Sequence, residues 1–164
     1  MCGFAGHVSI SSGVSSSVLQ AMGERLKHRG PDEQGLWQEG PVGLVHRRLA
    51  IQDLSAAGAQ PMTSASGRFV IAFNGEVYNF LDLRKALESA GVRFRGHSDT
   101  EVMLSAIESQ GFEEALKGFS GMFAFALMDR RERRLYLARD RMGEKPLYYG
   151  WQGGTFLFGS ELKP

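Results

Sequence analysis

Cysteine is almost absent from this chain: Cys2 is the single one among 164 residues. An intrachain disulfide is therefore excluded, and the composition suits a reducing compartment, so we expect a cytoplasmic location. The histidines His7, His28, His46 and His97 are scattered along the sequence. Because neither a Cys-x-x-Cys nor a His-Glu-x-x-His spacing occurs, we expect no metal site.

Phosphate-binding motifs and an excess of one charge are lacking as well. Neither Gly-x-x-x-x-Gly-Lys-Ser/Thr nor Gly-x-Gly-x-x-Gly is present, so we expect no cofactor in this domain. The 19 basic and 18 acidic side chains give a net charge of +1, which offers no electrostatic reason to expect a nucleic-acid partner. No apolar run approaches the ~18 residues of a membrane span, and the N-terminus lacks a signal pattern, so no membrane partner is expected.

What is present is the composition of an ordinary globular domain. Hydrophobic residues make up 43% of the chain and charged residues 23%. We expect a single domain, residues 1–164, which is long enough to bury ~70% of the surface that the unfolded chain exposes. The sequence leaves the oligomeric state open, a homodimer included.

Short apolar segments bounded by turn residues recur along most of the chain, and they predict strands. The expected strands are residues 3–10, 42–46, 68–74, 121–129, 133–140, 146–151 and 155–162. Strands in runs favour antiparallel sheets, and strands that are apolar throughout require burial on both faces.

Helical periodicity separates the early strands from the late ones. The serines at 15–17 can cap a helix with Val18, Met22 and Leu26 on its apolar face, which should end before Gly30.

Two further helices are expected in the middle of the chain. One carries Phe80, Leu83 and Leu87 on one face and closes at Gly91. The other begins at 98–101, which has the form of a capping box, and ends at a glycine, Gly111. Together with the strands, these helices predict an α+β fold, a four-layer αββα sandwich of two antiparallel sheets.

The position of Cys2 suggests chemistry. An initiator methionine is usually removed before a small residue, which would leave Cys2 with a free α-amine beside its thiol. An α-amine titrates near ~7.7–8.0 and a thiol near ~8.5, so the amine can accept the thiol proton and later protonate a leaving amine. The alternative is that a lone early cysteine is simply a small buried hydrophobe.

Three other features have both an ordinary and a functional interpretation. Asn74-Gly75 lies where a predicted strand ends, and it could be a turn or an oxyanion hole formed by the Asn74 amide and the Gly75 N–H. Arg48 could be a solvated side chain or a two-pronged clamp for a carboxylate. Asp99 could favour a helix N-terminus or pair with the α-ammonium of an amino-acid ligand.

The residues in their order resemble a known family, the class II, or N-terminal-nucleophile, glutamine amidotransferases. Within it the chain is most similar to the N-terminal glutaminase domain of glutamine-dependent asparagine synthetases, and the resemblance covers essentially the whole chain. The matching stretches are MCGFAG (1–6), KHRGPDEQG (27–35), HRRLAIQDL (46–54), GAQPM (58–62), FNGEVYN (73–79), SDTE (98–101), GMFAFALMD (121–129), RDRMGEKPLYYG (139–150) and GSELK (159–163).

The resemblance implies the N-terminal nucleophile hydrolase fold and hydrolysis of L-glutamine to glutamate and ammonia through a thioester on Cys2. It implies that Asn74 and Gly75 form the oxyanion hole, and that Arg48 binds the substrate carboxylate. The remaining residues that it assigns to the substrate pocket are Leu49, Ile51, Glu76 and Asp99. His28, Arg29 and Asp32 would shape a loop beside the site.

The resemblance also implies a partner. Full-length relatives continue into a C-terminal synthetase domain that binds ATP and Mg, which is absent from these 164 residues; it would use the ammonia to amidate an acceptor such as aspartate. Many relatives carry a branched aliphatic residue at the position of Gln52, so the resemblance does not assign this wall of the pocket. The alternative function is a catalytically silent module that docks onto a synthetase domain.

Overall fold

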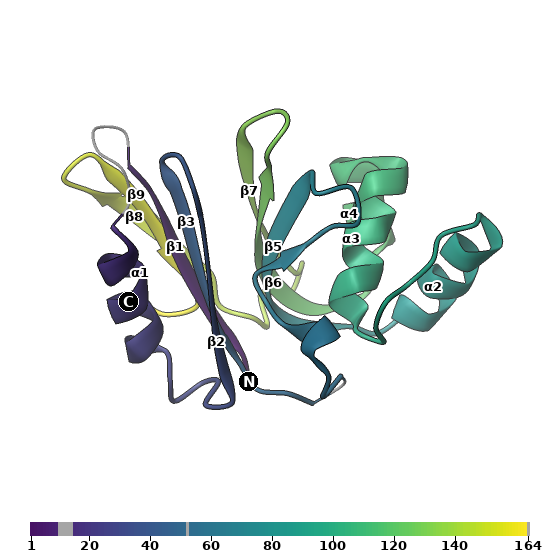
Figure 1. Ribbon diagram of the computed structural model, residues 1–164, viewed down its shortest axis with the longest axis horizontal. Helices are drawn as coiled ribbons and strands as arrows, with labels where there is room; N and C mark the ends of the chain where they lie inside the picture. Colours follow the sequence, from purple (N-terminus) through teal and green to yellow (C-terminus); the bar gives the residue numbers. More distant parts are fainter. Residues whose placement is uncertain (10–14, 52, 164) are drawn as a thin grey trace.

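Two antiparallel sheets lie face to face between helices (Figure 1). The computed structural model describes residues 1–9, 15–51 and 53–163. One sheet has the strand order β2-β3-β1-β9-β8, and the other has the order β4-β5-β6-β7. Helix α1 covers the outer face of the first sheet, and α2, α3 and α4 lie beyond the second. The predicted αββα sandwich is therefore confirmed.

The five-stranded sheet is built around the N-terminal strand. Its members are β1 (Gly3–Ser9), β2 (Glu33–Glu39), β3 (Val42–Arg48), β8 (Tyr148–Gln152) and β9 (Thr155–Gly159). β1 is central, because it pairs with β3 on one side and with β9 on the other. Residue 10, which the sequence placed at the end of this strand, lies outside the described residues. Strand β2 was not predicted, because its side chains are mostly polar and partly exposed.

The four-stranded sheet contains β4 (Met62–Thr63), β5 (Phe69–Val77), β6 (Gly121–Asp129) and β7 (Arg134–Arg139). The expectation that β5 ends at Asn74 is wrong. The strand continues to Val77, and Asn74 pairs with Ala124 in the middle of the ladder to β6. The turn interpretation of Asn74-Gly75 is wrong for the same reason, because both residues lie within the strand and stay in register with β6.

Helix α1 (Ser16–Arg25) differs from the expected helix in its buried face. Val18 is 46% exposed, whereas Leu19, Met22 and Leu26 are buried against the first sheet. Met22 and Leu26 are buried as expected, and Leu19 takes the place of Val18, because positions 19, 22 and 26 follow steps of three and four along one face. Ser15 occupies the cap position, but its hydroxyl bonds the hydroxyl of Ser17 instead of a backbone N–H.

The helices beyond the second sheet are α2 (Phe80–Ser89), α3 (Asp99–Gln110) and α4 (Phe112–Gly118), and a short 3-10 turn, η1, covers Ala56–Gly58. α3 begins as predicted, because the Ser98 hydroxyl accepts a hydrogen bond from the N–H of Glu101. The Glu101 carboxylate accepts the N–H groups of Arg95 and Gly96, so the reciprocal half of the capping box is not made. α4 was not predicted as a separate helix.

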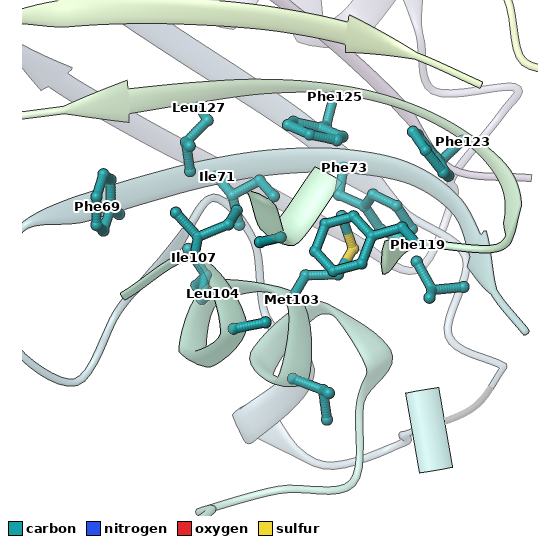
Figure 2. Packing of buried hydrophobic residues seen from close by; sticks show 14 of the residues in the cluster. Phe69, Ile71, Phe73, Met103, Leu104, Ile107, Phe119, Phe123, Phe125 and Leu127 are labelled. Atoms are coloured by element: carbon teal, nitrogen blue, oxygen red, sulfur yellow. The ribbon is translucent and has the colours of Figure 1, made fainter. Parts of the chain in front are cut away.

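Side chains of β5 alternate between two apolar interiors. Phe69, Ile71 and Phe73 face α3, where they pack with aromatic and aliphatic side chains of β6 (Figure 2). Val70 and Ala72 point the other way, into the space between the two sheets. By the same alternation, Asn74 and Glu76 point from β5 toward the first sheet.

Candidate active site

A cavity of about 170 Å³ lies at the end of the sandwich where β1 begins and β3 ends. All eight residues predicted from the sequence line it. They are Cys2, Arg48, Leu49, Ile51, Asn74, Gly75, Glu76 and Asp99. The other lining residues are Met1, Asp53, Gly58, Gln60, Phe73, Ser98, Thr100, Met122 and Lys145.

Strand periodicity explains why these side chains meet. On β3, Val42 and Leu44 face the second sheet, so Arg48 at the end of the strand faces it too. On β1, Phe4 faces the second sheet, which directs Cys2 the same way. With Asn74 on the opposing face of β5, the two sheets supply opposite walls of one cavity.

Cys2 is held in place by its neighbours. The N–H of Leu49 lies 3.4 Å from the Cys2 Sγ, and the carbonyl oxygen of Leu49 lies 3.6 Å from it. Arg29 donates from Nε to the Cys2 carbonyl at 2.9 Å and forms an ion pair with Glu161 at 3.1 Å. A side chain on Gly3 would press against Arg29, so glycine at this position permits the contact.

The loop stretch that contains Arg29 lies beside the cavity. The Asp32 carboxylate accepts the N–H of Ala50 at 2.9 Å, next to Leu49. His28 bonds Glu161 at 2.9 Å. The Asp32 contact joins the segment after α1 to the segment after β3, and the His28 contact joins it to the segment after β9.

Asn74 carries a hydrogen-bond donor that the fold leaves unused. Its side chain is 1% exposed, and its Nδ2 has no hydrogen-bond partner among the described residues. A buried polar group without a partner costs about 1–3 kcal/mol, so such a group calls for an explanation. A ligand oxygen in the cavity would supply the missing acceptor.

Gly75 lies directly against the neighbouring strand. A Cβ here would collide with the carbonyl oxygen of Met122 and with Phe123. Glycine therefore lets β5 run close to β6 next to Asn74, which keeps the backbone of this wall exposed to the cavity.

A histidine connects the two sheets behind Asn74. The Nε2–H of His46, on β3, donates to the carbonyl of Phe73 at 2.9 Å. Complete burial lowers the pKa of His46 to about 4, against a favourable contribution from the Phe73 carbonyl, so the ring is neutral near pH 7. The bond fixes β5 immediately before Asn74.

Arg48 is buried, and its guanidinium has several partners within the protein. Its guanidinium forms an ion pair with Glu33 at 2.8 Å and donates to the backbone carbonyls of Ser55 and Asp53. Gly58 leaves the space that the guanidinium occupies, because a Cβ there would collide with it. The fold thus places a fixed positive charge at this end of the cavity.

Asp53 supports Arg48 and was not identified from the sequence. Its carboxylate accepts the N–H of His97 at 2.9 Å and both the hydroxyl and the N–H of Ser55. The His97 N–H and the Ser55 hydroxyl lower the pKa of Asp53 to about 2, so it is ionised at neutral pH. The Asp-x-Ser spacing at 53–55 is the local signal that predicts such a turn.

Acidic side chains line another part of the cavity. Asp99, the first residue of α3, is 5% exposed and accepts the N–H of Val77 at 3.0 Å. Burial raises the pKa of Asp99, partly offset by its backbone hydrogen bonds. Glu76 is partly buried beside it on β5. The cavity therefore contains both a cation and acidic groups, as binding of a free amino acid requires.

Leu49 and Ile51 contribute apolar surface at different depths. Leu49 is partly buried next to Cys2, whereas Ile51 is 72% exposed and lies at the rim. Residue 52, the pocket-wall position at which this chain differs from many relatives, lies outside the described residues.

Two lining residues were missed although their motifs were noted. Gln60 accepts the N–H of Phe73 at 2.7 Å and lies 3.4 Å from the Thr100 hydroxyl, so it links β5 to α3. Lys145 is only 6% exposed. Both belong to stretches that match the family, GAQPM and RDRMGEKPLYYG, but no residue pattern in these stretches assigned them a role.

Metal coordination finds no support in the part of the chain that the structure describes, where no three His, Cys, Asp or Glu side chains gather as ligands. Among the same residues, no helix is long and apolar enough to cross a membrane.

An αββα sandwich with a thiol at the N-terminal end of its central strand has the architecture of the N-terminal nucleophile hydrolase fold. A family described as "Glutamine amidotransferase domain" matches residues 1–164. The chain therefore belongs to the glutamine amidotransferase domain family, as the sequence motifs predicted.

Individual relatives agree with this assignment. The chain is 42% identical over 168 residues to "Asparagine synthetase [glutamine-hydrolyzing] 3" of Bacillus subtilis, covering 99% of this chain and 27% of the relative. It is 36% identical to "Putative asparagine synthetase [glutamine-hydrolyzing] 2" of Methanocaldococcus jannaschii, covering 99% of this chain and 34% of the relative. The chain thus spans about a quarter to a third of the lengths of these proteins.

Solved structures share the fold. Glutamine phosphoribosylpyrophosphate amidotransferase from B. subtilis superimposes with a TM-score of 0.84 at 23% identity, over 98% of this chain and 42% of that one. At this level of identity the similarity shows the N-terminal nucleophile hydrolase fold alone.

Proposed function

We propose that this domain hydrolyses L-glutamine to glutamate and ammonia, with Cys2 as the nucleophile. The observation that carries the proposal is the buried Nδ2 of Asn74, which has no hydrogen-bond partner among the described residues and lies in the same cavity as the single thiol of the chain. An amide-cleaving thiol needs a donor for the oxygen that becomes negative, and a donor already fixed in place needs no reorganisation during the reaction.

The proposed reaction starts from a Cys2 whose methionine has been removed. The free α-amine takes the thiol proton, and the sulfur attacks the side-chain amide carbon of glutamine. The tetrahedral oxyanion is stabilised by the Asn74 amide and the Gly75 N–H. The ammonium of Cys2 then protonates the leaving nitrogen, the C–N bond breaks, and ammonia leaves a thioester behind. Water, activated by the same amine, attacks the thioester, so glutamate leaves and the thiol is restored.

Substrate recognition in this proposal uses the charged walls of the cavity. Arg48 binds the α-carboxylate, since its planar fork suits a carboxylate. Asp99 and Glu76 surround the α-ammonium. Leu49 and Ile51 contact the methylene groups between the charged end and the amide.

In the full-length protein, we propose, the ammonia passes to an ATP- and Mg-dependent synthetase domain that amidates an acceptor such as aspartate. The support is that the relatives named above are called asparagine synthetases and are about three to four times as long as residues 1–164. This chain's own part of the reaction uses no cofactor. A cytoplasmic location and a homodimer stay predictions from the sequence.

The test is ammonia release. Protein lacking Met1, verified by intact-mass spectrometry, is incubated with L-glutamine, and ammonia is measured by a coupled assay. We expect steady release by the processed protein, no release when Met1 is retained, and a loss of at least about 10³-fold in Cys2→Ala. Met1 retention acylates the Cys2 nitrogen and removes its basicity.

Two outcomes would contradict the proposed function. Release by Cys2→Ala at the wild-type rate would reject Cys2 as the nucleophile. A folded, processed wild-type protein that releases no ammonia would support the silent docking module instead, a function that the names of the relatives do not favour.

A further inference from the structure

Lys145 is a buried cation that the reaction proposed above does not use. It lies in the loop between β7 and β8, is 6% exposed, and lines the same cavity as Cys2 and Asn74. Within the described residues Lys145 takes part in no ion pair, and its Nζ lies 3.0 Å from the Sδ of Met1. Burying an ammonium without a carboxylate partner is unfavourable, so its presence in a cavity points to a function.

The loop that carries Lys145 is firmly attached to the oxyanion side of the cavity. The Asp140 carboxylate accepts the N–H groups of Lys145 at 3.0 Å, Glu144 at 2.9 Å and Phe123 at 3.2 Å. Burial opposes its ionisation, but these backbone N–H groups hold the pKa of Asp140 below its ordinary value. Because Phe123 pairs with Gly75 across the sheet, the position of Lys145 is fixed relative to the proposed oxyanion hole.

The other cations near Cys2 are already committed to carboxylates. Arg48 pairs with Glu33, and Arg29 pairs with Glu161. Lys145, by contrast, contacts the residue bonded directly to the Cys2 nitrogen. Removal of Met1 removes the Sδ that Lys145 contacts and leaves the ammonium in the cavity that Cys2 also lines.

The charges that face this amine are of both signs. A nearby positive charge favours the neutral form of an amine and the ionised form of a thiol, whereas nearby carboxylates do the reverse. The charged groups that line the cavity with Cys2 are Arg48 of β3, Glu76 of β5, Asp99 of α3, Asp53 of the loop after β3, and Lys145. Behind them lie Glu33 of β2 as the partner of Arg48, Asp32 beside Ala50, Arg29 with its partners Glu161 and His28, and Asp140 and Glu144 of the Lys145 loop.

We propose that the positive charge of Lys145 offsets the negative charge of the carboxylates in this cavity. The amine–thiol pair of processed Cys2 can then lose its proton near neutral pH. This inference rests on the proposed function, because it assigns a role to the α-amine of Cys2. Lys145 acts on Cys2 and does not contact the substrate. It is therefore a positioning residue, which influences the proton transfer that Cys2 carries out.

The experiment compares wild type with Lys145→Met, which keeps the apolar stem and removes the charge, and with Lys145→Arg, which keeps the charge. Lys117→Met is the matched control, because Lys117 lies on the exposed surface of α4, in an ion pair with Glu114. For each Met1-free protein, kcat/KM for glutamine is measured from pH 5.5 to 9. The alkylation rate of the single thiol by iodoacetamide is measured over the same range without glutamine.

We expect both profiles of Lys145→Met to move to higher pH by about one unit, because one neighbouring charge has been removed. At pH 6.5 this lowers kcat/KM about tenfold, and the loss nearly disappears at pH 9. Lys145→Arg should restore both profiles to within about twofold, and Lys117→Met should leave them unchanged.

Other outcomes overturn the proposal. A uniform loss at every pH would indicate a packing role, and a raised KM with unshifted profiles would make Lys145 a substrate contact. If wild type releases no ammonia, the proposed function fails, yet the alkylation profiles still decide whether Lys145 controls the Cys2 pair. Superimposable alkylation profiles of wild type and Lys145→Met would reject the inference in either case.

Discussion

The two sheets contribute different parts of the cavity. The five-stranded sheet provides Cys2 just before β1 and Arg48 at the end of β3, whereas the four-stranded sheet provides Asn74, Gly75 and Glu76 from the C-terminal half of β5. In the proposed reaction the first sheet carries the nucleophile and the residue that binds the substrate carboxylate. The second sheet carries the groups that stabilise the negative charge of the oxyanion. The site exists only where the two sheets are stacked in this register.

The sheets also differ in how they are covered. The outer face of the four-stranded sheet packs against α3 and α4 through a large apolar cluster that includes Phe125 and Ile107 (Figure 2). The outer face of the five-stranded sheet is covered by α1 through a much smaller cluster around Leu19. Strand β8 is exposed along its whole length. The more deeply buried sheet is thus the one that carries Asn74 and Gly75, the proposed oxyanion donors.

The largest expected effect separates catalysis from stability on the four-stranded side. Asn74→Ala should lower kcat for ammonia release by about 10²–10³-fold, the usual effect of removing one oxyanion donor. It should leave the melting temperature unchanged or slightly higher, because the Nδ2 that it removes has no partner among the described residues.

Asn79→Ala is the matched control for this variant. Asn79 donates to Gly118 and accepts from Ser120, so its replacement should reduce stability and leave kcat nearly unchanged. If Asn74→Ala kept a normal kcat, the division of labour between the two sheets would be wrong.

The next effect tests the connection between the sheets. Burial holds the pKa of His46 at about 4, below its value of 6.5 when unfolded, so the unfolded chain binds the additional proton first as the pH falls. The stability that the neutral ring contributes is complete above pH 6.5 and is lost as the pH falls toward 4. We expect the loss to reach about 3 kcal/mol at pH 4.

The measurement is urea unfolding of wild type and His46→Gln between pH 7 and 4. Glutamine can still donate to the Phe73 carbonyl but does not titrate, so the variant should lose about 3 kcal/mol less over this range. Parallel curves for the two proteins would show that His46 does not titrate on unfolding.

The smallest effect compares the two outer cores through the same substitution. Leu104 and Leu19 are 2% and 1% exposed, and each contacts one of the two outer clusters. Leu104→Ala should destabilise by about 4 kcal/mol and Leu19→Ala by about 3, because the surroundings of Leu104 are less able to collapse around the cavity. Denaturant midpoints measure the difference, and equal losses would remove the contrast in packing.

The sequence predicted most of the sandwich because apolar segments of strand length leave few alternatives. It failed where local signals and tertiary contacts disagree. Asn74-Gly75 is a typical turn dipeptide, yet nine ladder pairs with β6 carry β5 through it to Val77. β2 was missed because its polar side chains give no apolar pattern, although β3 pairs along its whole length.

Motifs identified the candidate site better than periodicity did. All eight expected residues line the cavity, but only the folded chain brings Arg48 and Asp99 into one space. The spacing at 53–55 indicates a turn at Asp53, but the contacts of Asp53 with His97 and of Gln60 with Thr100 could not be predicted, because they join segments that are far apart in the sequence. The unused donor of Asn74 is likewise a property of the fold and not of the dipeptide.

The central position of β1 has a practical consequence for preparing this protein. Cys2 enters the sheet between β3 and β9, and Met1 lines the cavity, so a peptide fused in front of Cys2 would begin at the cavity. An amino-terminal affinity tag would thus block the substrate space and the amine in one step, whereas a tag that a protease removes directly before Cys2 would give a molecule that can be switched on at a chosen time.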